Sequence, residues 1–499
     1  MSRDVLSPTE SVLSPMEPSP MEPTVVDPPL SAIERWRSLP AAQQPDWPDP
    51  VSARDIMAEL ANCPPLVAAR ECDLLKHRLA AVARGEAFLL QGGDCAERFD
   101  GVTADTVHNK LQALLQMSAV LTYAASIPVI KVGRIAGQYA KPRSKATETR
   151  DGITLLSYRG DAINGHEFTS AARIPDPRRL RRMYELSAVT LNLIRTFATG
   201  GSAALSEVHA WNQAFIARSP TGRRYRRLTG EIDRALRFMR ACGVDPAAVH
   251  TTELFTSHEG LLLDYETALT RIDTHTGRPY ATSGHMLWIG HRTRDLGGAH
   301  VDYFSRIANP IEVKLGPNVT PDTALGLIDK LDPHREPGRL TCIIRMGTEA
   351  IWDRLPDLVH KVTASGAQVV WVCDPMHGNT FESPSGHKTR RFTDILCEVE
   401  SFFAVHRALG THAGGIHVEL TGENVTECVG GGADITFGDL HHRYETSCDP
   451  RLNRSQSLDL AFLVAEMIMT PERSNPGTAP RGRPGPVEHS PRPPNGPRS

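Results

Sequence analysis

Lysine is scarce in this chain of 499 residues: only nine of its 55 basic residues are lysine, and the others are arginine. Codon bias explains most of such a ratio. An ammonium, however, can shift its pKa and donate a proton, which a guanidinium cannot do. The surviving lysines therefore carry information, and Lys141 and Lys314 stand out because each ends or follows a predicted strand.

The chain also lacks features of several protein classes. No apolar run approaches the roughly 20 residues of a membrane helix, and the N-terminus resembles neither a signal peptide nor a transit peptide. The nine cysteines form no CxxC pair, which indicates a reducing, cytoplasmic setting. The net charge of -3 gives no bias toward nucleic acid or membranes. No GxGxxG or Walker A loop favours a nucleotide-binding fold.

Both ends of the chain differ in composition from the body. Residues 1–30 contain seven prolines, and residues 471–499 contain nine prolines and five arginines. Such segments bury too little apolar surface to fold, so we predict disordered tails there. The folded body is expected over residues 31–470, with an N-terminal helical extension.

Eight short apolar runs are predicted to be strands, at residues 88–92, 128–135, 251–256, 286–290, 311–315, 340–346, 368–373 and 416–420. Helical periodicity recurs between most of them, as at 321–331, 351–363 and 392–408. Eight alternating units favour an α/β fold of the closed (β/α)8, or TIM-barrel, type over an open sheet. Extra helical segments at about 175–245 are interpreted as an insertion between the second and third strands.

Seven of the eight runs end in a cation or in a residue that can bind a metal. At or just past these ends lie Cys95, Arg134, Arg292, Lys314, Arg345, His377 and Glu419. Barrel enzymes carry their catalytic residues on the rim where the C-terminal ends of the strands meet. We therefore expect a site for a phosphorylated, anionic substrate beside a divalent metal. The third run ends at 256–259 without an assigned role.

Two residue sets carry the candidate chemistry, and each has a purely structural alternative. Possible metal ligands are Cys95, His377, Glu419 and Asp449, a borderline set for Mn, Co, Zn or Fe. A lone cysteine or histidine is more often part of the packing. Possible anion-binding residues are Arg134, Lys141, Arg143, Arg292, Lys314 and Arg345. For Lys314 the alternative is an ion pair with Glu312 or Asp374.

Long motifs in the chain resemble the class II (plant-like) 3-deoxy-D-arabino-heptulosonate 7-phosphate (DAHP) synthases. They include Gln-Gly-Gly-Asp-Cys-Ala-Glu (91–97), Arg-Ile-Ala-Gly-Gln-Tyr-Ala-Lys-Pro-Arg-Ser (134–144), Cys-Asp-Pro-Met-His-Gly-Asn-Thr (373–380) and Tyr-Glu-Thr-Ser-Cys-Asp-Pro-Arg-Leu-Asn (444–453). Residues 157–161 and 417–428 match in the same way. The resemblance covers roughly residues 31–470 and leaves out only the two tails.

This resemblance implies a transferase that condenses phosphoenolpyruvate with erythrose 4-phosphate, the first step of the shikimate pathway. By motif, Cys95, His377, Glu419 and Asp449 match the metal ligands, with Mn2+ or Co2+ favoured and Zn2+, Fe2+ or Cd2+ possible. The phosphoenolpyruvate site is matched by Arg134, Arg292, Lys314 and Arg345, and the erythrose 4-phosphate segment by Lys141, Arg143 and Ser144. Catalytic roles are expected for Lys141, Arg134 and Lys314, with Lys141 as a proton donor to the new alkoxide.

One position departs from the family pattern. His291 stands where the family usually has an acidic residue that lines the phosphoenolpyruvate site, and we predict a retained but shifted pH profile. Two alternative functions stay open: a paralogue of secondary metabolism that uses an amino analogue of the aldehyde, and a non-catalytic paralogue that binds a partner. The resemblance also implies a homodimer or homotetramer and a chorismate mutase partner, but no nucleic acid or membrane.

Overall fold

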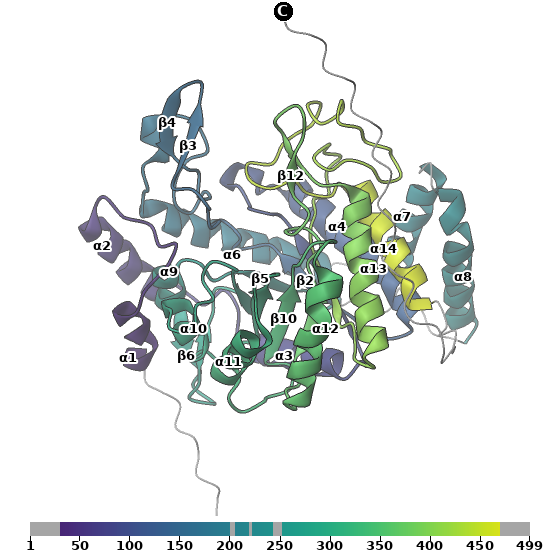
Figure 1. Cartoon of the computed structure of the whole chain (residues 1–499), viewed down its shortest axis with the longest axis horizontal. Helices are drawn as coiled ribbons and strands as arrows, with labels where there is room; N and C mark the ends of the chain where they lie inside the picture. Colours follow the sequence, from purple (N-terminus) through teal and green to yellow (C-terminus); the bar gives the residue numbers. More distant parts are fainter. Residues whose placement is uncertain (1–29, 200–204, 219–221, 243–251, 470–499) are drawn as a thin grey trace, which may run out of the picture.

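The computed structural model of the chain describes residues 30–199, 205–218, 222–242 and 252–469 (Figure 1). Eight parallel strands form a closed barrel in these residues. Each pairs with its neighbours in the order of the sequence: β1 (Phe88–Gly93), β2 (Val129–Arg134), β5 (Phe255–Glu259), β8 (Met286–Ile289), β9 (Ile311–Leu315), β10 (Leu340–Ile344), β11 (Val370–Cys373) and β14 (Gly415–Glu419). The predicted (β/α)8 fold is confirmed.

Seven predicted runs agree with the observed strands to within two residues, and the third was wrong in position. We expected a strand at 251–256, whereas β5 begins at Phe255 and continues through Ser257, His258 and Glu259. Three consecutive polar residues do not predict a buried strand. They are buried here because other elements supply partners, such as Glu266, which bonds His258 Nε2 at 2.8 Å.

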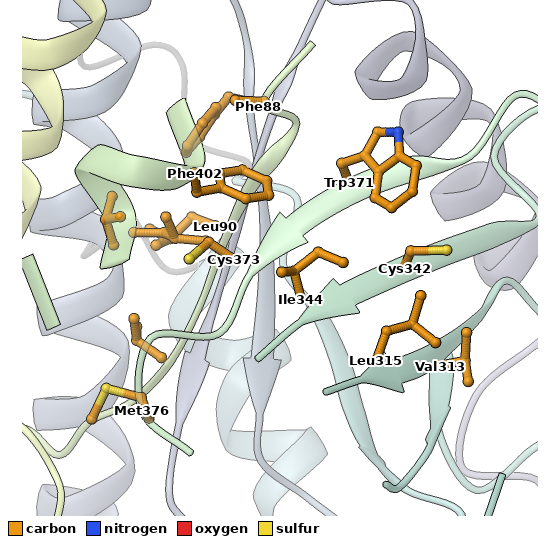
Figure 2. Packing of buried hydrophobic residues seen from close by; sticks show 14 of the residues in the cluster. Phe88, Leu90, Val313, Leu315, Cys342, Ile344, Trp371, Cys373, Met376 and Phe402 are labelled. Carbon is orange, nitrogen blue, oxygen red and sulfur yellow. The ribbon is translucent and has the colours of Figure 1, made fainter. Parts of the chain in front are cut away.

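Helices pack around the barrel wall and bury the outward side chains of the strands. The main ones are α4 (Ala104–Ala125), α10 (Ala299–Phe304), α11 (Pro321–Leu331), α12 (Ile351–Ala364), α13 (Phe392–Ala408) and α14 (Arg454–Met469). The buried positions of α13 recur every three or four residues, which gives one apolar face toward the barrel. Figure 2 shows Phe402 of this face beside Leu90 and Cys373 of the strands.

The N-terminal extension supplies α1 (Leu30–Ile33), the 3-10 helix η1 (Glu34–Ser38), α2 (Pro50–Ala61) and α3 (Ala69–Ala83). In α3, Leu75, Leu79 and Val82 form one stripe that packs with Leu89 and Val370 from the strands. These strand residues lie toward the N-terminal ends of their strands. The helix therefore closes that end of the barrel and leaves the opposite rim for chemistry.

The segment between β2 and β5 contains the predicted helical insertion. It comprises a hairpin of β3 (Thr147–Arg150) and β4 (Ile153–Leu156), the short α5 (Ser170–Arg173), and α6 (Arg178–Thr199), α7 (Leu205–Arg218) and α8 (Gly222–Ala241). The hairpin was not predicted, nor were α9 (Leu263–Ala268), β6 (Thr270–Ile272), β7 (Pro279–Ala281), β12 (Phe381–Glu382) and β13 (Lys388–Thr389). The predicted tails lie outside the described residues, apart from Leu30. No helix in the described part of the chain has the length and apolar character to cross a membrane.

Candidate active site

Three rim residues lie level with one another because of the strand register. Gly93 of β1 pairs with Glu419 of β14 on one side and with Arg134 of β2 on the other. A Cβ atom on Gly93 would lie 2.5 Å from the backbone oxygen of Arg134, so this close approach requires glycine. Arg134 Nη2 donates to Glu419 Oε1 at 3.0 Å, and both side chains are fully buried.

The four predicted metal ligands converge beside this row. The Cys95 thiol and one carboxylate oxygen each of Glu419 and Asp449 lie within 4.8 Å of one another. His377 lies outside this group of three but places its Nε2 atom 2.9 Å from Glu419 Oε1. The second carboxylate oxygen, Glu419 Oε2, is buried and lies 2.9 Å from Arg390 Nη2. This donor set fits a borderline divalent metal.

Lys141 places its ammonium among these ligands. Its Nζ atom lies 2.6 Å from Cys95 Sγ, 2.9 Å from Asp449 Oδ2 and 3.3 Å from Glu419 Oε1. Burial alone would lower the pKa of Lys141, but the three neighbours raise it well above its ordinary value. Burial alone would raise the pKa of Glu419, but His377 and Lys141 hold it well below its usual range. The lysine is therefore held in its charged form.

Asp374, directly after β11, connects the candidate metal ligands to Lys314. Its buried carboxylate accepts from His377 Nδ1 at 2.7 Å and from Lys314 Nζ at 2.9 Å. The first bond fixes the ring and leaves His377 Nε2 facing the cluster, an arrangement typical of metal-binding histidines. Burial would raise the pKa of Asp374, but His377 and Lys314 hold it well below its ordinary value. The ion pair considered as the alternative for Lys314 is therefore present.

A chain of polar groups inside the barrel supports Arg134. Gln91 Nε2 donates to Glu312 Oε2 at 2.7 Å, and Gln91 Oε1 lies 2.7 Å from His417 Nδ1. The other ring nitrogen of His417 contacts Arg134 Nη1. Burial raises the pKa of Glu312 to about 8, so this carboxyl is protonated at neutral pH. Arg134 also stacks over Trp288, with its guanidinium carbon 4.9 Å from the ring centre.

A cavity of about 340 Å³ opens beside the cluster. All residues predicted to bind substrate line it: Arg134, Lys141, Arg143, Ser144, His291, Arg292, Lys314 and Arg345. His377 and Asp449 line it as well, whereas Cys95 and Glu419 are fully buried. So many cations around one small cavity make it suitable for a ligand with several negative charges. The ion pair with Asp374 does not remove Lys314 from this cavity.

His291 contributes a neutral group to the cavity. Its Nδ1 atom lies 2.6 Å from Arg294 Nη1. Burial, together with Arg294 and Arg345, lowers the pKa of His291 to about 4. The imidazole is therefore uncharged at physiological pH, and it supplies neither the negative charge of an acidic residue nor a further cation.

The end of β5 supplies a site residue that the sequence reasoning missed. Glu259 lines the cavity, and its Oε1 atom is buried without a hydrogen-bond partner in the described part of the chain. Burial raises the pKa of Glu259, although Lys314 and Lys141 act against this rise. Its position at the end of a barrel strand was the available signal, but the misplaced third run hid it.

Two further residues support the candidate ligands from the segment just before α13. Arg390, which is fully buried, lies 2.9 Å from Glu419 Oε2 and donates to Thr380 Oγ1 at 2.9 Å and to the backbone oxygen of Pro450. Lys388 Nζ lies 3.2 Å from Asp449 Oδ1. Neither residue follows a barrel strand, so the pattern of strand ends did not mark them.

Comparison with known proteins identifies the family. A match to the class-II DAHP synthetase family covers residues 31–465. The chain belongs to this family. Two relatives are named phospho-2-dehydro-3-deoxyheptonate aldolase. The relative from Streptomyces coelicolor is 68% identical over 437 residues, which cover 88% of this chain and 97% of the relative. The relative from Mycolicibacterium smegmatis is 54% identical over 451 residues, which cover 88% and 96%, respectively.

The family assignment made from the motifs is thus confirmed. For this class-II DAHP synthetase, the fold brings the predicted metal ligands and the predicted substrate-binding residues to a single rim. Neither of the two alternative functions gains support from the relatives or from the geometry.

Proposed function

We propose that this DAHP synthetase uses the rim cavity to condense phosphoenolpyruvate with erythrose 4-phosphate and water, which yields DAHP and phosphate. The observation that carries the proposal is the convergence of a thiol, an imidazole and two carboxylates with a ring of cations on one cavity. Both substrates are phosphorylated anions, and one is an aldehyde. The cavity offers groups for each of these features.

A divalent metal would be held by Cys95, His377, Glu419 and Asp449. When bound, it would polarise the aldehyde carbonyl as a Lewis acid. The donor atoms of Cys95, Glu419 and Asp449 lie within 4.8 Å of one another, which supports this assignment. The mixed sulfur, nitrogen and oxygen donors suit a borderline divalent metal. Mn2+ or Co2+ is proposed from the family, and Zn2+, Fe2+ or Cd2+ are compatible with the same set.

The phosphoenolpyruvate subsite is proposed to consist of Arg134, Arg292, Lys314 and Arg345. Three of these cations are held in place by the protein itself, and one of them, Lys314, bonds Asp374 at 2.9 Å. The barrel network holds Arg134, while Arg345 donates to the backbone oxygen of His377 at 2.7 Å. Cations fixed before the substrate binds need no reorganisation as the phosphate departs, so they stabilise the charge that develops on it.

The aldehyde substrate is proposed to bind with its phosphate at Arg143 and Ser144. Its carbonyl group then lies toward Lys141 and the metal ligands. C3 of phosphoenolpyruvate attacks the carbonyl carbon, and the carbonyl oxygen becomes an alkoxide. Lys141 is held charged by its acidic neighbours, and it donates a proton to this oxygen.

Glu259 is proposed to act on the water that adds to C2. Its raised pKa and its unpartnered Oε1 atom suit a base that accepts a proton from water inside the cavity. The carbon–carbon bond formed at C3 leaves positive charge at C2, and the water oxygen bonds there as one of its protons passes to Glu259. The C2–O bond to phosphate then breaks as the remaining hydroxyl proton passes to the departing phosphate, which leaves a ketone at C2. The departing phosphate leaves toward the cations of the phosphoenolpyruvate subsite.

The test is an assay with phosphoenolpyruvate and erythrose 4-phosphate, before and after chelation and with Mn2+ added back. It follows loss of enoate absorbance together with phosphate release. Metal-dependent consumption of both substrates is expected. A folded, metal-loaded enzyme that consumes neither would refute the proposal, and turnover only with an amino-substituted aldehyde would redirect it to secondary metabolism.

We also propose a homodimer or homotetramer, association with a chorismate mutase, and a cytoplasmic location. All nine cysteines lie in the described residues and are free of disulfides, which supports a reducing compartment. Light scattering on the purified protein, alone and with a chorismate mutase, tests the two assembly proposals.

A further inference from the structure

A stretch of the N-terminal extension lies against the segment that carries Lys141, Arg143 and Ser144. Figure 1 shows α1 and α2 on the same side of the molecule as the β3–β4 hairpin, which follows that segment. The connection between η1 and α2 carries Gln43. Its side-chain amide accepts from the backbone N–H of Arg143 at 3.0 Å and donates to the backbone oxygen of the same residue at 3.2 Å.

Within the described part of the chain, the Arg143 backbone makes these two hydrogen bonds and no others. Arg143 lies in irregular structure between β2 and β3, beyond Pro142, where neither a helix nor a sheet ladder fixes its peptide groups. The Gln43 amide thus bonds both polar groups of Arg143, as a neighbouring β-strand would. The Arg143 side chain lines the active-site cavity, and its guanidinium lies 3.8 Å from Glu148 Oε2 and 4.0 Å from Cys448 Sγ. The backbone held by Gln43 sets the point from which this side chain extends.

The two hydrogen bonds between the Gln43 amide and the Arg143 backbone are called the clamp below. Gln43 adopts an unusual backbone conformation to make them. Its φ angle is +61°, in the left-handed region that a residue with a Cβ atom rarely occupies. Such conformations persist where the surrounding contacts hold them, and they cluster at functional sites. The contacts here are the two bonds to Arg143 and the guanidinium of Arg159, which donates to the backbone oxygens of Gln43 and Gln44.

Arg159 provides a second connection from the same stretch to the catalytic segment. While its guanidinium bonds the oxygens of Gln43 and Gln44, its own backbone oxygen accepts from the N–H of Lys141 at 2.9 Å. Gln44 is anchored in turn, since its amide bonds the Leu261 oxygen at 2.7 Å and the Leu263 N–H at 3.1 Å. The extension is therefore fixed to the barrel on one side and to the catalytic segment on the other.

We propose that Gln43 is a positioning residue for the phosphate of the aldehyde substrate, because its amide fixes the Arg143 backbone and so aims the Arg143 side chain. This rests on the role proposed above for Arg143 and Ser144. The phosphoenolpyruvate subsite is built from other elements and takes no support from Gln43.

Gln43→Gly is the sharpest test, because glycine accepts the left-handed conformation without strain and removes only the amide. The KM for erythrose 4-phosphate is expected to rise about fivefold to tenfold, the effect of losing one to two neutral hydrogen bonds. The KM for phosphoenolpyruvate is expected to stay within about twofold. Gln43→Glu keeps the acceptor but places a carboxylate oxygen opposite the backbone oxygen of Arg143. It should therefore weaken the binding of erythrose 4-phosphate at least as much as Gln43→Gly does.

A binding measurement separates positioning from chemistry. Erythritol 4-phosphate carries the phosphate but no aldehyde, so it binds without turnover to the Mn2+-loaded enzyme in the presence of phosphoenolpyruvate. Calorimetric titration is expected to give a dissociation constant that rises in Gln43→Gly by the same factor as the KM. Ala42→Gly, a change at the exposed neighbouring position, is the matched control and should leave both values unchanged.

The outcomes distinguish this inference from the proposed function. A wild-type enzyme without turnover contradicts the proposed function itself. An active wild-type enzyme whose Gln43→Gly variant keeps its affinity for both phosphorylated ligands contradicts only the clamp. Equal losses for phosphoenolpyruvate and erythrose 4-phosphate, together with a lower melting temperature, would mean that Gln43 merely stabilises the fold and would also overturn the inference.

Discussion

Replacement of Asp374 by asparagine is expected to damage two subsites of the enzyme with one change. The carboxylate accepts from His377 Nδ1 at 2.7 Å and from Lys314 Nζ at 2.9 Å, and it is completely buried. Asparagine has the same shape, so the change removes the charge without opening a cavity. It also places an N–H₂ group or an uncharged oxygen opposite the His377 ring. The hydrogen bond that orients this ring is therefore weaker.

The size of the effect follows from the burial of both partners. Lys314 is only 6% exposed, and the loss of one member of a buried ion pair costs about 3–5 kcal/mol because the other charge is left without compensation. Loss of a carboxylate that orients a metal-binding histidine typically weakens metal binding about 10- to 100-fold. Lys314 without its partner should also lower the affinity for phosphoenolpyruvate.

Three measurements check Asp374→Asn against Asp357→Asn, which alters an exposed carboxylate on α12. Urea unfolding gives the stability, calorimetric titration with Mn2+ gives the metal affinity, and steady-state kinetics give the KM for phosphoenolpyruvate. In Asp374→Asn the stability and the Mn2+ affinity are expected to fall and the KM for phosphoenolpyruvate to rise, whereas Asp357→Asn should change none of the three. Unchanged Mn2+ affinity in a stable variant would refute the view that Asp374 orients a metal ligand.

Three further changes test other parts of the site and the fold. Arg390→Met should weaken Mn2+ binding about tenfold or more, since Arg390 lies 2.9 Å from Glu419 Oε2, whereas Arg391→Met at the exposed neighbour should not. His291→Glu should shift the pH profile of kcat/KM for phosphoenolpyruvate. An imidazole that is neutral in the assay range is replaced by a carboxylate, whose negative charge raises the pKa of neighbouring cations such as Lys314; an identical profile would count against this role. Burial lowers the pKa of His406 from 6.5 to about 3. The contribution of the neutral His406 ring to the free energy of unfolding is therefore present above pH 6.5 and is lost as the pH falls. The loss is about 2 kcal/mol between pH 7 and 5. Urea unfolding of His406→Gln should show a flatter pH dependence.

The sequence predicted the barrel well because its strands are buried on both faces. Runs such as 340–344 are almost continuously apolar. A charged residue within a buried run, such as Lys314 in 311–315, marks a site. The rule that the C-terminal ends of the strands share one rim then predicted most of the candidate site residues. It failed at β5, where Ser257, His258 and Glu259 are polar yet buried. Their burial depends on other elements, such as Gln91 of β1, which bonds Ser257.

Supporting residues could not be predicted, because nothing local distinguishes them. Glu398 lies on α13 and resembles any helical glutamate in the sequence. In the structure its carboxylate accepts from the N–H groups of Met346 and Gly347 at 2.9 and 2.8 Å and from Asn379 at 2.7 Å. It thereby joins the loops that carry Arg345 and His377. Such a role appears only when two loops and a helix are placed in space.

The rim is held by separate supports, and each serves a different part of the reaction. Asp374 and Glu398 fix the loops of His377 and Arg345, the barrel interior fixes Arg134, and Gln43 fixes Arg143. Gln43 and Asp374 share no hydrogen-bond partner among the described residues, and changes at independent positions add in free energy. A defect at Gln43 should therefore appear mainly in the binding of the aldehyde substrate, whereas a defect at Asp374 should appear in the binding of the metal and of phosphoenolpyruvate. This separation explains how one small cavity can hold two anionic substrates in fixed positions beside a metal.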